Sequence, residues 1–389
     1  MSAPAPDEAE LSVAALLAEA QRATGLEDFG DPAFREGLDV LVATYLANGF
    51  DARRLRRERR RLGQLLATRL RVVDALRRHP EIRTRALRSP MILTGFPRTG
   101  TSALFNLLAA DPAARPLLLW EGVFPDPLEG LPSGQTDPRL EALRAHYEKG
   151  REKNPEFSKI HEVRADGPEE CVLLLAHAFC DVQMGIEPLL EPYASWFQAQ
   201  DLRAAYALYH DLLRMLDWQR PGERWLLKSP AHLWALDVLV ERFPDVCLVV
   251  THRDPVEILG SYCSMMAALL TGQTHFDPKA LGPVVLEYLA RSMERGLAAR
   301  ERSDPARFVD VDYGAFLADP LAEARRIYAA FGLALGAEAG AAMRAHLERH
   351  PQHRHGTHDY QLESFGLEAG RVRERLAAYT ARFGLAPGR

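Results

Sequence analysis

Three cations of this chain stand where a parallel sheet would bring them together. Each ends a predicted strand or lies in the segment just after one, and they are Arg98, Lys228 and Arg253. The strands before them are expected at residues 91–94, 224–227 and 246–251. A guanidinium binds a phosphate through two parallel hydrogen bonds, and a fixed cation stabilises negative charge that develops on an oxygen. The three residues therefore predict a site for one anionic ligand.

The loop around Arg98 has the frame of a phosphate-binding loop. Residues 95–100 read Gly-Phe-Pro-Arg-Thr-Gly, and a predicted helix opens at Thr101. Such a loop aims backbone N–H groups and the positive end of a helix dipole at one point. A nucleotide triphosphatase has lysine directly after the second glycine, whereas this chain carries its cation inside the loop, where a guanidinium needs no metal ion to complete its phosphate contact.

We therefore expect phosphate contacts from the whole loop, namely Phe96, Pro97, Arg98, Thr99, Gly100, Thr101 and Ser102. The alternative is a tight strand–helix turn with a surface arginine.

Length and composition are those of an ordinary globular protein. The chain has 389 residues, of which 47% are hydrophobic and 26% charged. Its net charge of −5 argues against nucleic acid as the main partner. The four cysteines show neither paired nor zinc-binding spacing, the N-terminus lacks the features of a signal peptide, and the longest apolar runs are shorter than a membrane span. The sequence predicts a cytoplasmic protein with reduced thiols and no transmembrane segment.

Strands that alternate with helices predict an α/β protein with a doubly wound parallel sheet. A fourth strand is expected at residues 307–311, and helices follow each strand. In such sheets ligands bind at the carboxyl ends of the strands, where the three cations lie. Residues 166–170 contain a proline and acids typical of a helix start, so we expect a helix that continues from Cys171 to Cys180.

Residues 1–88 predict a helical extension to an α/β domain of residues 89–389. After a break at residues 25–32, one long helical segment is expected from Phe34 to about Arg88. Its arginines at positions 53–61 could bind an acidic ligand or anionic lipid, but charge runs are usually solvated helix faces, and we favour that interpretation. The extension is expected to pack over the core or to mediate self-association, for which a homodimer is the default expectation.

The three cation-bearing segments together resemble the motifs of sulfotransferases that use 3′-phosphoadenosine 5′-phosphosulfate (PAPS). The first family motif is a phosphate loop with a cation before Thr-Gly-Thr or Ser-Gly-Thr, matched by Arg98-Thr99-Gly100-Thr101. The second is an arginine with a serine eight residues later that hold the 3′-phosphate, matched by Arg253 and Ser261. The third is a strand-ending lysine, matched by Lys228. The resemblance covers about residues 90–265, and the tail from residue 356 to 367 is similar to a bacterial subgroup.

The resemblance implies metal-independent transfer of a sulfonyl group from PAPS to a hydroxyl or amine of a small-molecule, lipid or carbohydrate acceptor. Arg98 and Lys228 would stabilise the charge on the departing 5′-phosphate. The acceptor needs a general base, and two candidates remain. Glu121 occupies the position where carbohydrate-type members place a glutamate base, and its alternative is an ion pair with Arg115. His232 lies four residues after Lys228, where cytosolic members have a histidine two residues after the lysine.

The late histidines His350, His353, His355 and His358 lack the spacing of a zinc site, so no metal is expected. We expect their loop, with Arg354 and Tyr360, to fold over the donor or acceptor. The aromatics Phe124, Tyr147, Phe157, Tyr193, Trp196, Phe197 and Tyr206 suggest a partly apolar acceptor pocket, although such residues are more often core.

Three alternatives stay open at this point. The first is a phosphate-loop kinase, which the missing lysine disfavours. The second is a non-catalytic protein of the same fold that binds or scaffolds, and the third is the same fold used for other chemistry.

Overall fold

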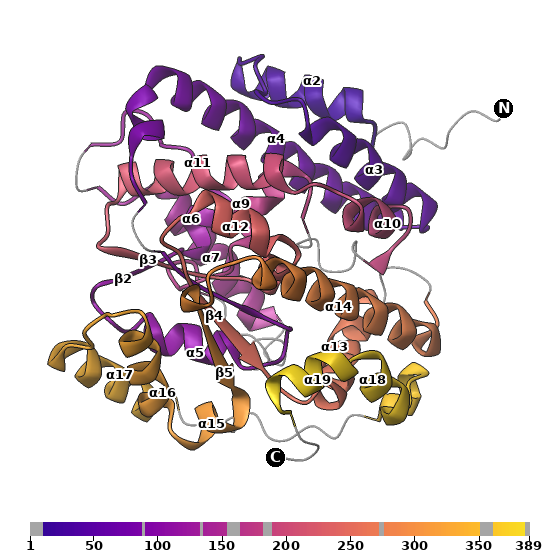
Figure 1. Cartoon of the computed structure of the whole chain (residues 1–389). Coiled ribbons are helices and arrows are strands. Elements are labelled where there is room, and N and C mark those ends of the chain that lie inside the picture. The colour runs from indigo at the N-terminus through magenta and orange to yellow at the C-terminus, as the bar shows by residue number, and fades with distance from the viewer. Residues whose placement is uncertain are drawn as a thin grey trace.

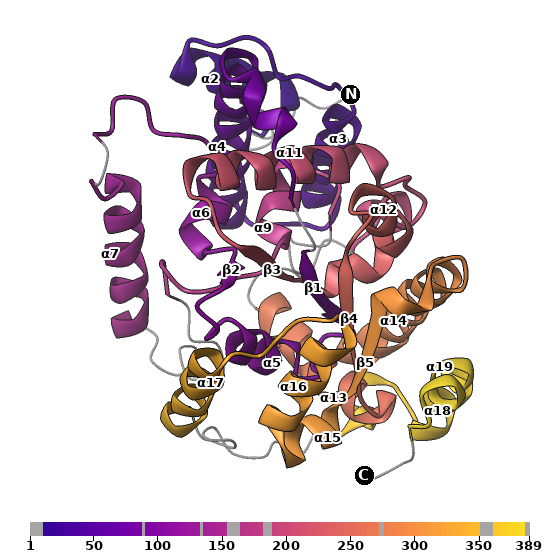
Figure 2. The same cartoon turned by 60° about the vertical axis from the view of Figure 1, so that its left-hand side comes forward.

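The computed structural model describes residues 11–87, 90–132, 135–153, 164–181, 189–271, 276–350 and 361–385. Its centre is a five-stranded sheet of order β2-β3-β1-β4-β5, in which every neighbouring pair is parallel. The strands are β1 (Met91–Gly95), β2 (Ala114–Pro116), β3 (Arg224–Lys228), β4 (Cys247–His252) and β5 (Phe308–Asp312). Helices lie on both faces of the sheet (Figures 1 and 2), which confirms the predicted α/β class.

The central strands are buried on both faces, as their apolar and β-branched sequences predict. Ile92, Leu227 and Leu248 belong to the core on one face of the sheet. Their chain neighbours Leu93, Leu226 and Val249 belong to the core on the other face. The register pairs Gly95 with Thr251 and Leu93 with Lys228, so the loops after β1, β3 and β4 meet at one edge.

The smaller core lies under four helices, which are α5 (Thr101–Leu108), α15 (Tyr313–Ala318), α16 (Pro320–Ala330) and α17 (Ala337–Arg349). The larger core includes α12 (Leu236–Arg242), α13 (Pro255–Leu270), α14 (Pro278–Glu301), α18 (Ala369–Arg375) and α19 (Ala377–Phe383). Short 3₁₀ turns, η4 (Pro230–Ala235) and η6 (Leu362–Phe365), precede α12 and α18.

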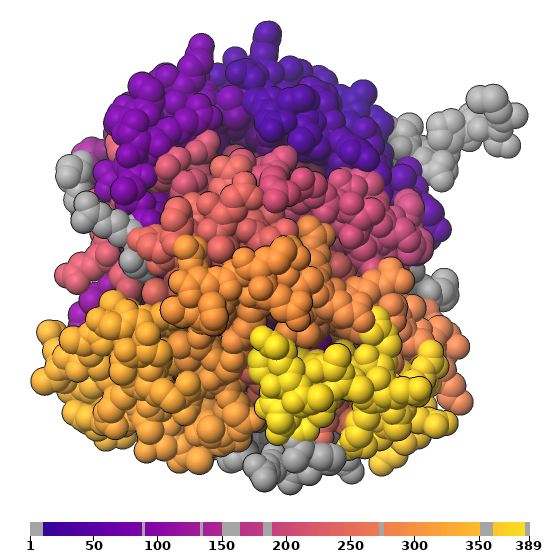
Figure 3. Space-filling view, viewed as in Figure 1, coloured from indigo at the N-terminus to yellow at the C-terminus, as the bar shows by residue number. Residues whose placement is uncertain are grey.

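The N-terminal helices extend the larger core. They are α2 (Val13–Thr24), α3 (Phe34–Ala47) and α4 (Ala52–Arg78), followed by the turn η1 (Pro80–Thr84). Their buried residues form one cluster with those of α10 (Tyr193–Gln198) and α11 (Arg203–Gln219). In Figures 1 and 2 they lie on the side of α11 away from the sheet, and in Figure 3 they form one end of the molecule. The division of the chain after residue 88 stays a prediction.

The long helix expected from Phe34 is wrong as a single element. The chain turns between α3 and α4 at Gly49, whose φ of 63° is left-handed, and Asp51 then caps α4 by accepting a hydrogen bond from Arg54 N–H. On α4 itself, Arg53, Arg56, Arg57 and Arg60 are exposed. Arg54 is instead buried and ion-paired with Glu58, so the arginine run is only partly a solvated face.

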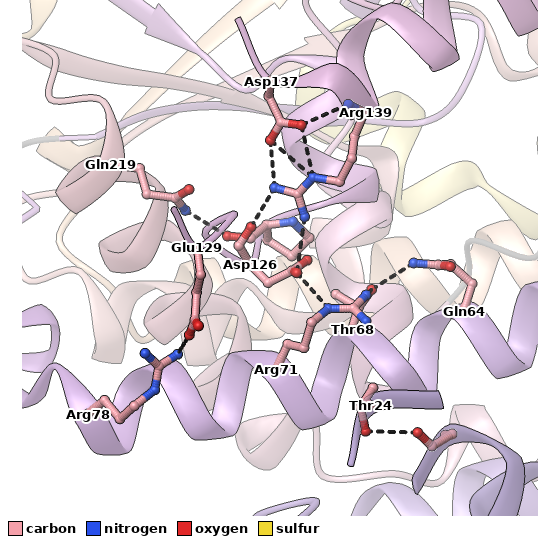
Figure 4. A network of polar contacts seen from close by, with 12 residues as sticks. Thr24, Gln64, Thr68, Arg71, Arg78, Asp126, Glu129, Asp137, Arg139 and Gln219 are labelled. Carbon is pink, nitrogen blue, oxygen red and sulfur yellow. Dashed lines mark hydrogen bonds and ion pairs between the residues drawn. The ribbon is translucent and has the colours of Figure 1, made fainter. Parts of the chain in front are cut away.

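A polar network fastens α4 to the loop that precedes α7 (Pro138–Lys153) (Figure 4). The buried Asp126 carboxylate accepts hydrogen bonds from Arg71 of α4 at 2.7 Å and from Arg139 of α7 at 3.0 Å. Arg139 also binds Asp137, and Gln219 of α11 donates to the Pro125 carbonyl. One carboxylate thus joins two helices that are far apart in the sequence.

The helix expected over residues 166–180 is wrong at its start and too long. Pro168 pairs with Leu118 in an antiparallel bridge, and Glu169 donates its N–H to the Leu117 carbonyl. Only α9 (Val172–Leu175) and the turn η2 (Ala176–Ala178) are helical. Phe179 follows with a positive φ of 55°, which ends the turn. Pairing with the segment before α6 (Leu119–Val123) therefore overrides the local helix signals. No helix in the described part of the chain is long and apolar enough to cross a bilayer.

Candidate active site

The loop between β1 and α5 needs glycine at both ends. Gly95 has φ 137° and Gly100 has φ 82°. A Cβ at Gly95 would lie 2.5 Å from the Thr251 carbonyl oxygen, and one at Gly100 would lie 2.7 Å from the Tyr313 ring. Between them Arg98 adopts φ 69°, a left-handed conformation that is costly for a residue with a side chain. Strain of this kind persists where the surroundings hold it, and it often marks a functional position.

Thr99 holds the loop from inside. Its hydroxyl donates to the Phe96 carbonyl at 2.6 Å and lies 2.6 Å from the Thr251 hydroxyl of β4. Thr99, Phe96 and Thr101 are buried, so the loop is a fixed structure beneath the exposed Arg98. The first N–H groups of α5 point out of its N-terminus at Thr101 and Ser102, as a phosphate-binding loop requires.

The arginine and serine motif after β4 meets this loop directly. Arg98 Nε donates to Ser261 Oγ of α13 at 2.9 Å, and Arg253 Nη1 donates to the Arg98 carbonyl at 3.2 Å. The Arg253 guanidinium also binds Glu257 at 2.8 Å and lies over the Tyr313 ring at 4.5 Å. Two of the predicted cations are therefore in contact, and both belong to one group with Ser261.

Lys228 reaches the same edge from β3. Its ammonium donates to Ser102 Oγ at 3.1 Å and to Glu170 Oε1 at 2.6 Å. The lysine side chain is buried, while Glu170 keeps 25% of its side chain exposed. The Lys228 carbonyl accepts the N–H of Cys171, which fixes the segment that carries Glu170 against the strand end.

Glu170, which the sequence analysis does not single out, also belongs to this group through its bond with Lys228. The sequence predicts Glu170 in a helix start, whereas the bridge between Pro168 and Leu118 places it beside Lys228. One signal could have indicated this position. Glycine and proline precede the acidic pair Glu169–Glu170, and such a segment is as typical of a loop as of a helix start.

Glu121 is bonded to residues outside this group. It is 2% exposed, and its carboxylate accepts from Arg115 at 2.8 and 2.9 Å and from Arg220 at 2.9 Å. The same carboxylate accepts the Leu118 N–H at 3.0 Å, so its oxygens are held by two arginines and by the start of α6. The structure thus shows the ion pair with Arg115 that the sequence left as the alternative.

His232 is enclosed in the core under the site. It is 0% exposed, its Nδ1 lies 2.9 Å from the Tyr206 hydroxyl, and its Nε2 has no partner in the described part of the chain. Burial lowers the pKa of His232 to about 3, so the ring is neutral near pH 7. Tyr206 and Tyr209 pack against the ring at centroid distances of 5.8 Å.

Arg354 and Tyr360 lie outside the described residues, as do His353, His355, His358 and Phe157. His350 is exposed at the end of α17. Within the described ranges, no three His, Cys, Asp or Glu side chains form a group that could hold a metal ion. Of the aromatics considered for an acceptor pocket, Tyr193, Phe197 and Tyr206 are core residues.

Comparison with known proteins points to one family. The model of the sulfotransferase family matches residues 90–336. Two curated relatives, the omega-hydroxy-beta-dihydromenaquinone-9 sulfotransferases Stf3 of Mycobacterium bovis and Mycobacterium tuberculosis, are each 33% identical over 113 residues. These matches span only 28% of this chain and 28% of each relative.

Two solved structures are similar over nearly the whole chain. Sulfotransferase STF1 of Mycobacterium tuberculosis has 34% identity and a TM-score of 0.83, covering 94% of this chain and 98% of that one. Sulfotransferase STF9 of Mycobacterium avium has 29% identity and a TM-score of 0.88, covering 97% of each chain. At this coverage the likeness includes the N-terminal helices as well as the sheet.

Proposed function

This chain belongs to the sulfotransferase family, and from that premise we propose that it is a sulfotransferase with PAPS as its donor and a hydroxyl or amine as its acceptor. The observation that carries the proposal is the contact of Arg98 with both members of the second motif, Arg253 and Ser261. A donor with a 5′-phosphosulfate and a 3′-phosphate needs two anion sites at a fixed separation. The loop of residues 96–102 and the pair Arg253–Ser261 offer two adjacent sites of this kind.

In the proposed reaction, the bond from sulfur to the bridging oxygen of the donor breaks and a bond from sulfur to the acceptor oxygen forms. Arg98, Lys228 and the N–H groups of the loop stabilise the charge that grows on the leaving phosphate. These groups are fixed before the reaction, so little reorganisation accompanies it. Adenosine 3′,5′-bisphosphate is released, and no metal ion is needed for these contacts.

We favour Glu170 as the group that receives the acceptor proton. It is half-buried beside Lys228 and Ser102, so it can contact an acceptor without breaking a buried structure. Glu121 would have to leave two arginines, and His232 would have to be uncovered from the core. Lys228 donates to both Glu170 and Ser102, so the proton acceptor and the phosphate loop belong to one site.

Replacement Glu170→Gln tests this role. The variant should retain the affinity of the wild type for adenosine 3′,5′-bisphosphate within about threefold, while turnover falls about 100-fold or more. Turnover is measured with labelled PAPS and whichever phenol, sterol or hydroxylated isoprenoid quinone the wild type sulfates. Glu121→Gln serves as the comparison, and a larger loss of turnover there, in a folded variant, would return the role to Glu121.

The acceptor that we propose is a hydroxyl on a partly apolar small molecule or lipid. The relative Stf3 is an omega-hydroxy-beta-dihydromenaquinone-9 sulfotransferase, which supports a lipid acceptor, and a carbohydrate remains the second class. We also propose a cytoplasmic location, supported by four free cysteines, because disulfides are rare in reducing compartments. A homodimer stays a prediction.

Calorimetric titration with adenosine 3′,5′-bisphosphate tests the donor. We expect metal-independent binding to the wild type and a loss of at least about tenfold in Arg253→Ala, because that guanidinium would contact a charged group. Arg203→Ala is the matched control, since Arg203 is likewise an arginine paired with acids and lies on the surface. Binding of ATP with Mg²⁺ and no response to the bisphosphate would overturn the proposed donor and favour the kinase alternative. Binding of the bisphosphate without turnover of any acceptor would instead favour a degenerate, non-catalytic protein.

A further inference from the structure

The C-terminal helices α18 and α19 pack against the two segments of the proposed donor site, the loop of residues 95–100 and the segment of Arg253. They are anchored by Arg375 of α18, which binds Glu287 at 2.9 Å and Glu294 at 2.5 Å on α14. This anchor holds α19 against Phe96 of the phosphate loop and Arg253 before α13. In Figure 3 the C-terminal helices form the yellow surface beside the orange one. These two helices support the donor site, and none of their residues has a role in the proposed reaction.

Tyr379 of α19 is the point of contact with both loops. Its ring lies edge-on to that of Phe96, with centroids 5.1 Å apart, and both side chains are buried. Its hydroxyl accepts the backbone N–H of Arg253 at 3.3 Å and lies 3.4 Å from the Arg253 carbonyl. One side chain therefore touches the loop proposed for the 5′-phosphate and the residue proposed for the 3′-phosphate.

The residue before Arg253 is fixed by the same helix. His252 stacks on Phe383 of α19 at a centroid distance of 3.8 Å, and its Nε2 lies 2.8 Å from Asp310. Asp310 is in turn held by both terminal nitrogens of Arg300 at 2.6 Å. The backbone before Arg253 is thus held in position by two contacts of His252, one with β5 and one with α19.

We propose that Tyr379 is a positioning residue for donor binding, which sets the Arg253 segment against the loop of residues 95–100. This inference rests on the proposed function. A bidentate contact between a guanidinium and a phosphate depends on the exact position of both groups. The distance between the two anion sites therefore determines whether one donor molecule can bind at both of them. The hydroxyl of Tyr379 sets the Arg253 side of that separation, and its ring sets the Phe96 side.

The test compares two ligands by calorimetry, adenosine 3′,5′-bisphosphate and adenosine 5′-monophosphate, which lacks the 3′-phosphate. In Tyr379→Phe, where only the hydroxyl is lost, we expect affinity for the bisphosphate to fall about three- to tenfold and affinity for the monophosphate less than about twofold. A general loss of structure would lower both equally. Tyr379→Leu, which also removes the ring, should weaken both ligands.

Tyr328→Phe is the matched control, because Tyr328 is another buried tyrosine whose hydroxyl is bonded, to Asp111 at 2.6 Å, away from the two loops. Arg375→Gln loosens the anchor without touching either loop and should show the same preference for weakening the bisphosphate. Unchanged selectivity for the 3′-phosphate in both Tyr379→Phe and Arg375→Gln overturns the positioning role while leaving the donor intact. Failure of the wild type to bind the bisphosphate overturns the donor and this inference together.

Discussion

Arg98 is the residue where conformation and proposed chemistry conflict. Its φ of 69° costs an ordinary side chain about 1–2 kcal/mol relative to the right-handed regions. Glycine would adopt this angle without cost, yet glycine has no guanidinium to contact Ser261 or a phosphate. The conformation is therefore stabilised by the surrounding loop, and the function that we propose requires the strained residue.

The pair Arg98→Gly and Arg98→Ala separates these two effects. Both variants lose the guanidinium, so both should bind adenosine 3′,5′-bisphosphate about 10- to 100-fold more weakly than the wild type. The angle of 69° strains alanine but not glycine, so the free energy of unfolding of the alanine variant should be about 1 kcal/mol below that of the glycine variant. Urea unfolding and calorimetry measure the two quantities. Equal stability of the two variants would show that the loop relaxes and that no strain is held there.

At the scale of elements, the sheet was predictable where each strand has its own signal. The β-branched run before Arg253 predicts β4. Gly95 and Gly100 mark the two ends of the loop after β1, where no side chain fits. β2 was not predicted, because Ala114-Arg115-Pro116 has no alternating pattern. It is a strand only through its pairing with β3. Nearest-neighbour pattern alone cannot show such a pairing.

The site residues divide in the same way. Arg98, Lys228 and Arg253 were predictable because each follows a recognisable strand. The position of Glu170 beside Lys228 depends on a bridge between Pro168 and Leu118. The Glu121 carboxylate is bound by Arg115 and Arg220. The bridge and the Arg220 contact are long-range, so local composition does not contain them, whereas the Arg115 pair is close in sequence and was expected as the alternative.

The network around Asp126 gives a prediction for how α4 is fastened (Figure 4). Asp126 is 1% exposed and serves both Arg71 and Arg139, which are themselves partly exposed. In Asp126→Asn the two guanidinium groups face an uncharged partner in a buried position, so the free energy of unfolding should fall by about 2–3 kcal/mol. Asp74→Asn is the control, because Asp74 pairs with the exposed Arg77 and Arg78, and such pairs contribute less than about 1 kcal/mol. Equal losses in the two variants would mean that the network does not fasten α4 to the core.

For the whole molecule, the larger core is one continuous cluster from the N-terminal helices to the C-terminal ones. Two histidines are enclosed within it. His177 lies between the N-terminal helices and α6, with its Nε2 3.3 Å from the Gly122 carbonyl, and His232 lies between η4 and α11. Burial lowers the pKa of His177 to about 4 and that of His232 to about 3.

These two histidines predict that the folded state loses stability in mild acid. Between the unfolded pKa of about 6.5 and the folded values, the unfolded chain binds protons that the folded chain does not, so stability falls as the pH falls. Each histidine should contribute about 2 kcal/mol of this loss between pH 8 and pH 5, above the range where most carboxylates titrate. Urea unfolding at the two pH values measures it. His232→Asn should reduce the difference between them by about 2 kcal/mol whatever its effect at pH 8. His146→Asn, at an exposed position on α7, should leave the difference as in the wild type. A pH dependence unchanged in His232→Asn would mean that solvent reaches His232 in the folded protein, and His232 would then return as a candidate for the general base.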